Sequence, residues 1–146
     1  MVAKKPKIVI LGETLVDLFF ESIEEDSSDL IFRGALGGAP ANVAANLSSV
    51  KIPVSLVTGF SSDSLGLQLK SLLENRNIDV SASSTVQHSK TPLALVLSSP
   101  CGEREFRLYL KESVLESFVL DLKLLPREMA PFSLPLKKVS NTPRQS

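Results

Sequence analysis

Glycine, proline and asparagine gather in one short segment, Gly37–Ala44, in an arrangement that suits ligand binding. Gly37 and Gly38 allow the backbone to approach a ligand closely, and a helix beginning at Pro40 would point its free N–H groups at the same place. Asn42, one turn into that helix, offers both a donor and an acceptor, which suits a polyhydroxylated ligand. A tight turn before a helix, with Asn42 bonded to its own backbone, explains the same residues equally well.

A carboxylate stands among large apolar residues at Asp17, in the sequence LVDLFF. An ionised carboxylate in such surroundings is costly unless it faces water or a partner. Asp17 is therefore either a solvated strand residue or an acceptor of hydrogen bonds from sugar hydroxyls in a polar cleft. The spacing of its neighbours leaves both interpretations open.

The composition argues against several classes of partner. The 146 residues carry 16 basic and 16 acidic side chains, so no positive field attracts nucleic acid or an anionic membrane surface. Cys101 and His88 are the only residues of their types, which leaves no disulfide framework and no zinc cluster within one chain. The apolar run 8–11 is too short for a signal-peptide core or a membrane-spanning helix. We expect a cytoplasmic protein with no nucleic-acid partner and no membrane partner.

Strand and helix patterns alternate along the chain and predict the elements that must position these residues. Lys7–Leu11 is a continuous apolar run, typical of a parallel strand buried on both faces. Leu15–Glu21 and Asp29–Ala35 are extended segments that form an antiparallel flap. Pro40–Val50 is an alanine-rich helix, and Val54–Thr58 is a short β-branched strand.

A second helix begins after Ser62 or Asp63, either of which can cap it. Its apolar face is formed by Leu65, Leu69, Leu72 and Leu73. Strand, helix, strand and helix in this order predict a Rossmann-type three-layer α/β arrangement around a parallel sheet.

The C-terminal third of the chain changes character twice. Thr91–Ser98 and Glu103–Leu110 predict a half-exposed hairpin, because apolar and polar residues alternate in the second run. Glu112–Leu125 has its apolar residues at helical spacing. Residues 126–146 carry prolines without any periodicity, so we expect an irregular or disordered tail after a single domain of residues 1–125.

Two blocks of the sequence, GETLVD at 12–17 and GGAPANVA at 37–44, resemble the opening blocks of the PfkB-family, ribokinase-like carbohydrate kinases in order and in separation. Three weaker blocks are similar too, and the last resembles the hairpin turn of fructokinase-like members: they are Gly59–Gly66, Lys90–Ala94 and Gly102–Phe106. The resemblance covers roughly residues 7 to 110, and the glycine and asparagine block is its most specific part.

The resemblance implies a partial ribokinase-like fold, a Rossmann-type three-layer α/β sandwich with a small antiparallel β lid formed by strands at about 15–35 and 91–110. In the family, residues matching Asp17, Gly37, Gly38 and Asn42 line the pocket for a monosaccharide such as fructose. The lid covers this pocket and often mediates homodimer formation. ATP and Mg²⁺ are the expected cofactors of the complete family enzyme.

The chain departs from the family in several places. Lys51-Ile52-Pro53 replaces a glycine, Ser61-Ser62-Asp63 replaces Gly-Asp-Asp, and Leu108–Glu112 replaces the Arg, Asn and Pro pattern of fructokinase-like members. The family's phosphate-handling block, an Asp followed by Gly-Ala-Gly-Asp, supplies the anion hole and the catalytic base, but no glycine occurs after Gly102. The resemblance assigns no catalytic residue, no metal ligand and no ATP-binding residue here. We expect an N-terminal part of a kinase, inactive alone, and the sugar is left open.

Two other functions fit the same residues. The chain could be a non-catalytic interaction module that keeps the lid and the sheet for pairing with another kinase subunit. It could also belong to a nucleoside kinase of the same superfamily, in which the pocket under the lid accepts a base as well as a ribose.

Overall fold

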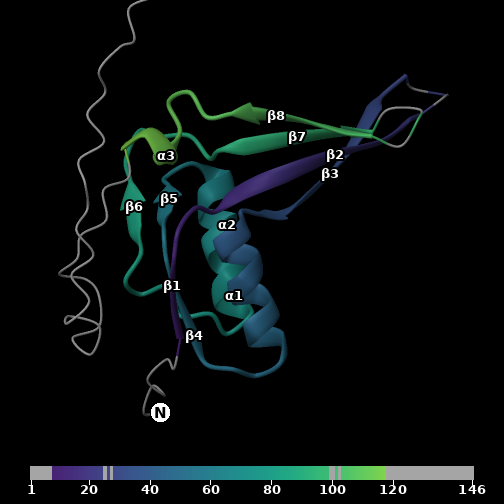
Figure 1. The fold of residues 1–146 in the computed structure, drawn as a ribbon. Coiled ribbons are helices and arrows are strands. Elements are labelled where there is room, and N and C mark those ends of the chain that lie inside the picture. Colours follow the sequence, from purple (N-terminus) through teal and green to yellow (C-terminus); the bar gives the residue numbers. More distant parts are fainter. Residues whose placement is uncertain (1–7, 25, 27, 99–100, 102, 118–146) are drawn as a thin grey trace, which may run out of the picture.

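A computed structural model describes residues 8–24, 26, 28–98, 101 and 103–117, which form a body and a lid (Figure 1). The body contains β1 (Ile8–Leu11), α1 (Ala39–Ser49), β4 (Val54–Val57), β5 (Gly59–Ser61), α2 (Ser64–Asn75) and β6 (Ser84–Val86). The lid contains β2 (Leu15–Ile23), β3 (Leu30–Gly37), β7 (Leu93–Ser98) and β8 (Arg104–Tyr109), and the short helix α3 (Val114–Ser117) follows it.

Parallel strands form the centre of the body. β1 pairs in parallel with β4, and Asp79 forms a parallel bridge to Ser55 on the other edge of β4. β5 and β6 form a second parallel pair. The parallel strand predicted at Lys7–Leu11 is confirmed from Ile8 onward, and Lys7 lies outside the described residues. The sequence does not predict β5 and β6, because three residues are too few to show a period.

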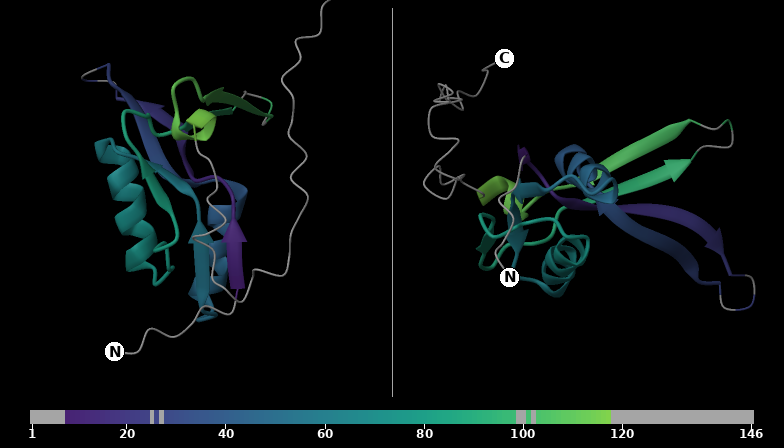
Figure 2. Two further views of the ribbon diagram at one scale, coloured as in Figure 1. Left: turned by 90° about the vertical axis from the view of Figure 1, so that its left-hand side faces the viewer. Right: turned by 90° about the horizontal axis from the view of Figure 1, so that it is seen from below.

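The lid is one mixed sheet with the strand order β3-β2-β7-β8. Each of its hairpins, β2–β3 and β7–β8, is antiparallel, as the sequence predicts. The two hairpins also join each other, because β2 and β7 pair in parallel from Val16↔Leu93 to Phe19↔Val96. The predicted flaps are therefore two halves of a single surface, which extends away from the body in the views of Figure 2.

Both long helices begin close to their predicted positions. α1 starts at Ala39, one residue before Pro40, and the proline occupies a position in the first turn where its missing N–H costs nothing. α2 starts at Ser64 and is capped by the side chain of Asp63 rather than by Ser62. Of the helix predicted at Glu112–Leu125, the described part is Val114–Ser117, while residues 118–125 and the predicted tail lie outside the described residues.

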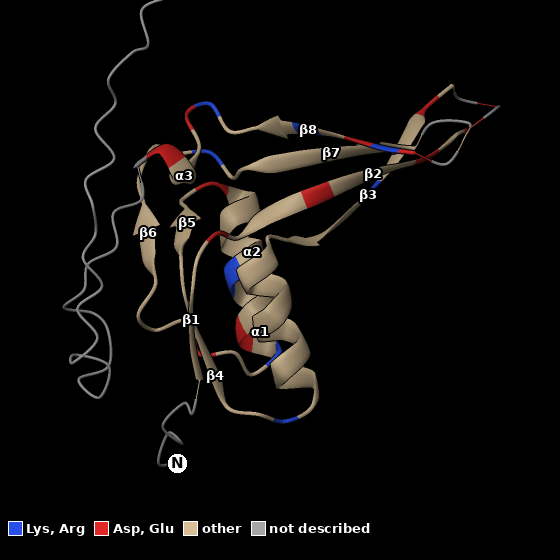
Figure 3. Ribbon diagram, viewed as in Figure 1, with Lys and Arg blue, Asp and Glu red and all other residues tan. Residues whose placement is uncertain are grey.

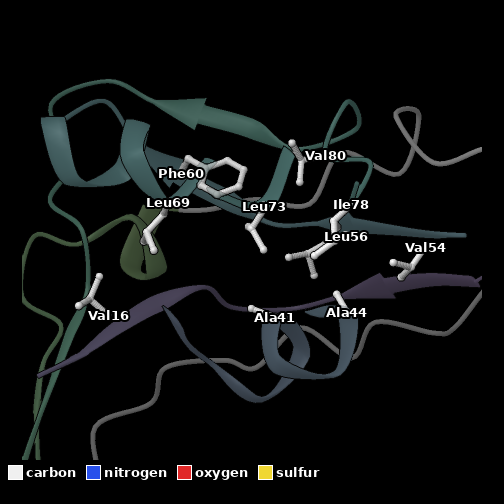
Figure 4. Close-up of a cluster of buried hydrophobic side chains, with 10 residues drawn as sticks. All are labelled: Val16, Ala41, Ala44, Val54, Leu56, Phe60, Leu69, Leu73, Ile78 and Val80. Carbon is white, nitrogen blue, oxygen red and sulfur yellow. The ribbon is translucent and has the colours of Figure 1, made fainter. Parts of the chain in front are cut away.

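A cluster of buried apolar side chains connects the two helices to the strands and to the base of the lid (Figure 4). Its buried members are Val16, Ala41, Ala44, Val54, Leu56, Phe60, Leu69, Leu73, Ile78 and Val80. α1 and α2 also meet at their C-terminal ends, where the hydroxyl of Ser48 donates a hydrogen bond to the carbonyl of Arg76. Because Val16 is the second residue of β2 and belongs to the cluster, the lid is packed onto the body at its base.

The outer strand of the lid differs from its prediction. All six residues of β8 are exposed, including Phe106 and Leu108, each with 60% of its surface accessible. The alternation in Glu103–Leu110 predicts a half-exposed hairpin, and that is wrong for β8, because among the described strands it lies at the edge of the sheet, beside β7 alone. β7 has buried residues on one face, Ala94 and Val96.

Charged residues of both signs are scattered over the body and the lid (Figure 3). This distribution agrees with the net charge of zero. Within the described part of the chain, none of the helices has the length and apolar character that crossing a bilayer requires.

Candidate functional site

Asp17 lies in β2, between Ala35 of β3 and Ala94 of β7. Its side chain is half-buried, and no hydrogen bond or ion pair joins its carboxylate to any other described residue. Arg33, which lies on β3 opposite Phe19, is paired with Glu21, at 2.8 Å between Nε and Oε1. Burial raises the pKa of the Asp17 carboxyl. Asp17 therefore keeps its capacity to accept hydrogen bonds.

Gly37 ends β3 directly beside this carboxylate. A Cβ atom built on Gly37 would lie 2.7 Å from Oδ1 of Asp17 and 2.5 Å from Cδ1 of Leu15. Any side chain at this position would displace the carboxylate. The glycine thus leaves room for the Asp17 carboxylate beside the end of β3.

Gly38 and Asn42 continue the site into α1. Gly38 is the N-cap residue, with a φ of 94°, and a Cβ built on it would lie 2.6 Å from the carbonyl oxygen of Glu13. Its own carbonyl accepts the backbone N–H of Asn42 at 2.9 Å, the first bond of the helix. The Asn42 side chain is exposed and bonds to no other described residue, Asp17 included. The structure thus brings Asp17 and Gly37 into contact, with Gly38 and Asn42 following them in the chain.

A surface pocket of the described residues lies elsewhere. It has a volume of about 720 Å³ and is lined by residues that include Lys51, Pro53 and Asp79, near the start of β4 and the C-terminal ends of both helices. None of the four predicted site residues lines it. We base the candidate site on Asp17, a half-buried carboxylate without a partner among the described residues, rather than on this pocket.

One set of contacts between the body and the lid is missing from the sequence prediction. The carboxylate of Asp63, expected only as a possible helix cap, also accepts two hydrogen bonds from Thr91. Burial alone would raise the pKa of Asp63, but the hydrogen bonds from Thr91, Gly66 and Ser61 together lower it. Asp63 and Thr91 belong to two of the weaker family-like blocks, Gly59–Gly66 and Lys90–Ala94, but nothing in the sequence of either block indicates that the two residues are in contact.

No three His, Cys, Asp or Glu side chains gather as a metal-ion site in the part of the chain that the structure covers. Asp17 and Asp63 belong to separate groups of contacts.

Comparison with known proteins gives this geometry its context. Residues 5–125 match the family described as pfkB family carbohydrate kinase. Fructokinase-2 of Zea mays is 33% identical over 127 residues, which cover 82% of this chain and 37% of the maize protein. The chain therefore spans less than half the length of that relative.

Solved structures agree with the sequence match. A fructokinase from Xylella fastidiosa with bound ATP superimposes with a TM-score of 0.66 at 28% identity, over 73% of this chain and 33% of that one. A putative ribokinase II from E. coli gives a TM-score of 0.71 over 86% of this chain and 40% of that one, at 20% identity, which shows the fold alone. With the match over residues 5–125 and a β lid joined to a parallel α/β body, the chain belongs to the pfkB family of carbohydrate kinases.

Proposed function

We propose that this chain supplies the monosaccharide-binding part of an ATP-dependent sugar kinase, with fructose as the first sugar to test. The observation that carries the proposal is the carboxylate of Asp17, which is half-buried and has no partner among the described residues. A carboxylate that has lost part of its hydration gains most from ligand hydroxyl groups, because charge-assisted hydrogen bonds are about twice as strong as neutral ones.

The neighbours of Asp17 support a sugar as the ligand. Gly37 keeps the space beside the carboxylate free of a side chain, and the N-terminal end of α1 begins at the next residues. Asn42 adds an amide that can donate and accept. A ring of hydroxyl groups can use an acceptor, free N–H groups and an amide at once, as saccharide sites commonly do.

Relatives suggest which sugar and which phosphate donor belong to the complete enzyme. The maize relative is a fructokinase, and the Xylella fructokinase was solved with ATP. We propose ATP, with Mg²⁺, for the complete enzyme and no turnover by the present chain alone, since it contains no Gly-Ala-Gly-Asp block.

A thermal-shift panel tests the ligand class directly. Fructose, glucose, ribose and adenosine are each added to the chain, and the unfolding temperature is measured. A larger rise with fructose than with adenosine supports the sugar assignment, because a ligand that binds only the folded state raises its stability. A rise with adenosine and none with any sugar would favour a nucleoside kinase instead.

We also propose that two copies of the chain pair through the lid. Phe106 and Leu108, on the edge strand β8, are both 60% exposed. The register Asp17↔Ala94 and Ala94↔Leu108 puts Leu108 on the same face of the lid as Asp17. Large exposed apolar side chains on one face mark an interaction surface, and a second lid would cover them.

A further inference from the structure

A single carboxylate joins the body to the lid at Asp63. Its Oδ1 accepts the backbone N–H of Gly66 at 2.7 Å, which caps α2, and also accepts the hydroxyl of Thr91 at 2.6 Å. Its Oδ2 accepts the backbone N–H of Thr91 at 2.7 Å. One side chain therefore bonds both the start of α2 and the residue that lies two positions before β7.

A second hydrogen-bonded path runs parallel to the first. The backbone N–H of Asp63 donates to Oγ of Ser61 at 3.0 Å, and the hydroxyl of Ser61 donates to the carbonyl of Ser89 at 2.7 Å. Ser61 is 1% exposed and Thr91 is 7% exposed, so water competes little for these bonds. The segment that leads into β7 is thus held to the body at both Ser89 and Thr91.

The strand held in this way is the one that lies beside Asp17. The carbonyl of Pro92, which follows Thr91, accepts the backbone N–H of Val16 at 3.0 Å. β7 then pairs with β2, and Ala94 lies opposite Asp17. A shift of Thr91 would therefore also move the next three residues, Pro92 to Ala94. Because these residues pair with β2, the shift would reach the backbone of Asp17.

We propose that Asp63 is a positioning residue for the sugar site: by bonding Thr91 it fixes the place of β7 and, through β7, the place of Asp17 relative to α1. This inference rests on the proposed function, because it assigns Asp63 a part in sugar binding. The inference goes beyond that function because it makes the geometry of the sugar site depend on the contact between Asp63 and Thr91, which lies outside the site itself.

The bonding pattern separates this role from that of an ordinary helix cap. A cap needs one acceptor, and asparagine serves at this position about as well as aspartate. The bonds to Thr91 need acceptors on both side-chain oxygens, because Oδ1 and Oδ2 each receive one of them. An amide has one acceptor oxygen and an NH₂ group that only donates, so Asp63→Asn keeps the cap and loses a bond to Thr91.

The test compares the full chain with Asp63→Asn, Thr91→Val and Thr91→Ser by amide hydrogen exchange and by fructose titration. We expect Asp63→Asn and Thr91→Val to leave exchange in α2 unchanged, to speed exchange at Val16 about tenfold and to weaken fructose binding about three- to tenfold, as expected for one lost charge-assisted bond. Thr91→Ser keeps the hydroxyl and should behave like the unchanged chain.

Amide hydrogen exchange and fructose titration test the inference and the proposed function separately. If the unchanged chain does not bind fructose, the proposed function is wrong, while the exchange rates at Val16 still decide whether Asp63 holds β7. If Asp63→Asn speeds exchange in α2 and at Val16 equally, Asp63 is a cap and nothing more. Unchanged exchange at Val16 with unchanged fructose affinity also overturns the inference.

Discussion

The carboxylate of Asp17 occupies the space that a side chain on Gly37 would need. The two residues are diagonal neighbours across the β2–β3 hairpin, because Gly37 pairs with Leu15 and Asp17 pairs with Ala35, and 2.7 Å separates Oδ1 of Asp17 from the position of a Cβ on Gly37. Real Cβ atoms do not approach an oxygen so closely, so the carboxylate can occupy this position only while residue 37 is a glycine.

Replacing Gly37 by alanine should disrupt the site. We expect Gly37→Ala to push the Asp17 side chain aside, to destabilise the fold by about 1–3 kcal/mol and to weaken fructose binding at least about tenfold. Chemical denaturation and a fructose titration measure the two effects. The matched control is Gly34→Ala on the same strand, where the nearest atom to the new Cβ would be Cγ1 of Val16 at 3.5 Å, an ordinary contact. Equal losses in both variants would contradict the close contact with Asp17.

The raised pKa of Asp17 predicts how fructose binding depends on pH. The carboxylate accepts hydrogen bonds only while it is ionised, so binding should be lost as the pH falls through the folded pKa, which lies above the ordinary value of 3.8 because of burial. A titration at several pH values measures the midpoint. In Asp17→Asn, binding should be weak at every pH and should not show this midpoint. A midpoint below 3.8 would mean that a partner, rather than burial, controls this carboxyl group.

The lowered pKa of Asp63 has the opposite sign and a different consequence. Its folded pKa lies below 3.8, so the stability that its hydrogen bonds provide is fully present above the pKa of the unfolded chain and is lost as the pH falls through the folded value. Unfolding free energies measured from pH 6 downward should therefore fall less steeply in Asp63→Asn than in the unchanged chain. Because Asp17 titrates above 3.8, fructose binding should disappear before this stability does. Identical slopes for the two proteins would contradict the bonding of Asp63.

Pairing through the lid should depend on one face of β8. We expect Phe106→Lys and Leu108→Lys each to shift the chain from dimer to monomer in light scattering, because a lysine charge opposes burial at an apolar interface. Tyr109 is a matched control: it is 57% exposed on the same strand but faces the other way, beside Leu93 and Leu95. A dimer that dissociates with Tyr109→Lys and not with Leu108→Lys would assign the interface to the opposite face.

The chain alone should not phosphorylate a sugar. Anion-hole donors contribute about a hundred- to a thousandfold each to the rate, and the sequence contains no Gly-Ala-Gly-Asp block of the kind that we expect to supply them together with the catalytic base. We expect no production of ADP above a buffer control with ATP, Mg²⁺ and fructose. Production that depends on fructose and stops in Asp17→Ala would show that this chain contains its own catalytic groups.

Local chemistry made much of the body predictable. Pro40 marks the first turn of α1, and Asp63 was one of two possible caps for α2, because caps and prolines act within a few residues. The sequence assigns Asp17 and Gly37 to one family site but does not predict that they are in contact. The distance between them depends on the register of the β2–β3 hairpin, which shifts between Phe20 and Ser22.

Long-range pairing accounts for what the sequence does not predict. Most elements of the body lie between β2 and β7 in the sequence. Their parallel pairing therefore follows from packing rather than from any local period. The same applies to the bond between Asp63 and Thr91, 28 residues apart. The exposure of the β8 side chains depends on which elements pack around the strand. The alternation of apolar and polar residues in β8 does not show that the strand lies at the edge of the described sheet.

The sugar-binding role of Asp17 can be tested most directly by titrating the isotopically labelled chain with fructose and following its backbone amide signals by NMR. The proposed site predicts saturating shifts at Asp17, Gly37, Gly38 and Asn42, smaller shifts elsewhere, and none of these shifts in Asp17→Asn. Shifts confined to the cavity beside Lys51 and Asp79, or the same response in Asp17→Asn, would contradict it.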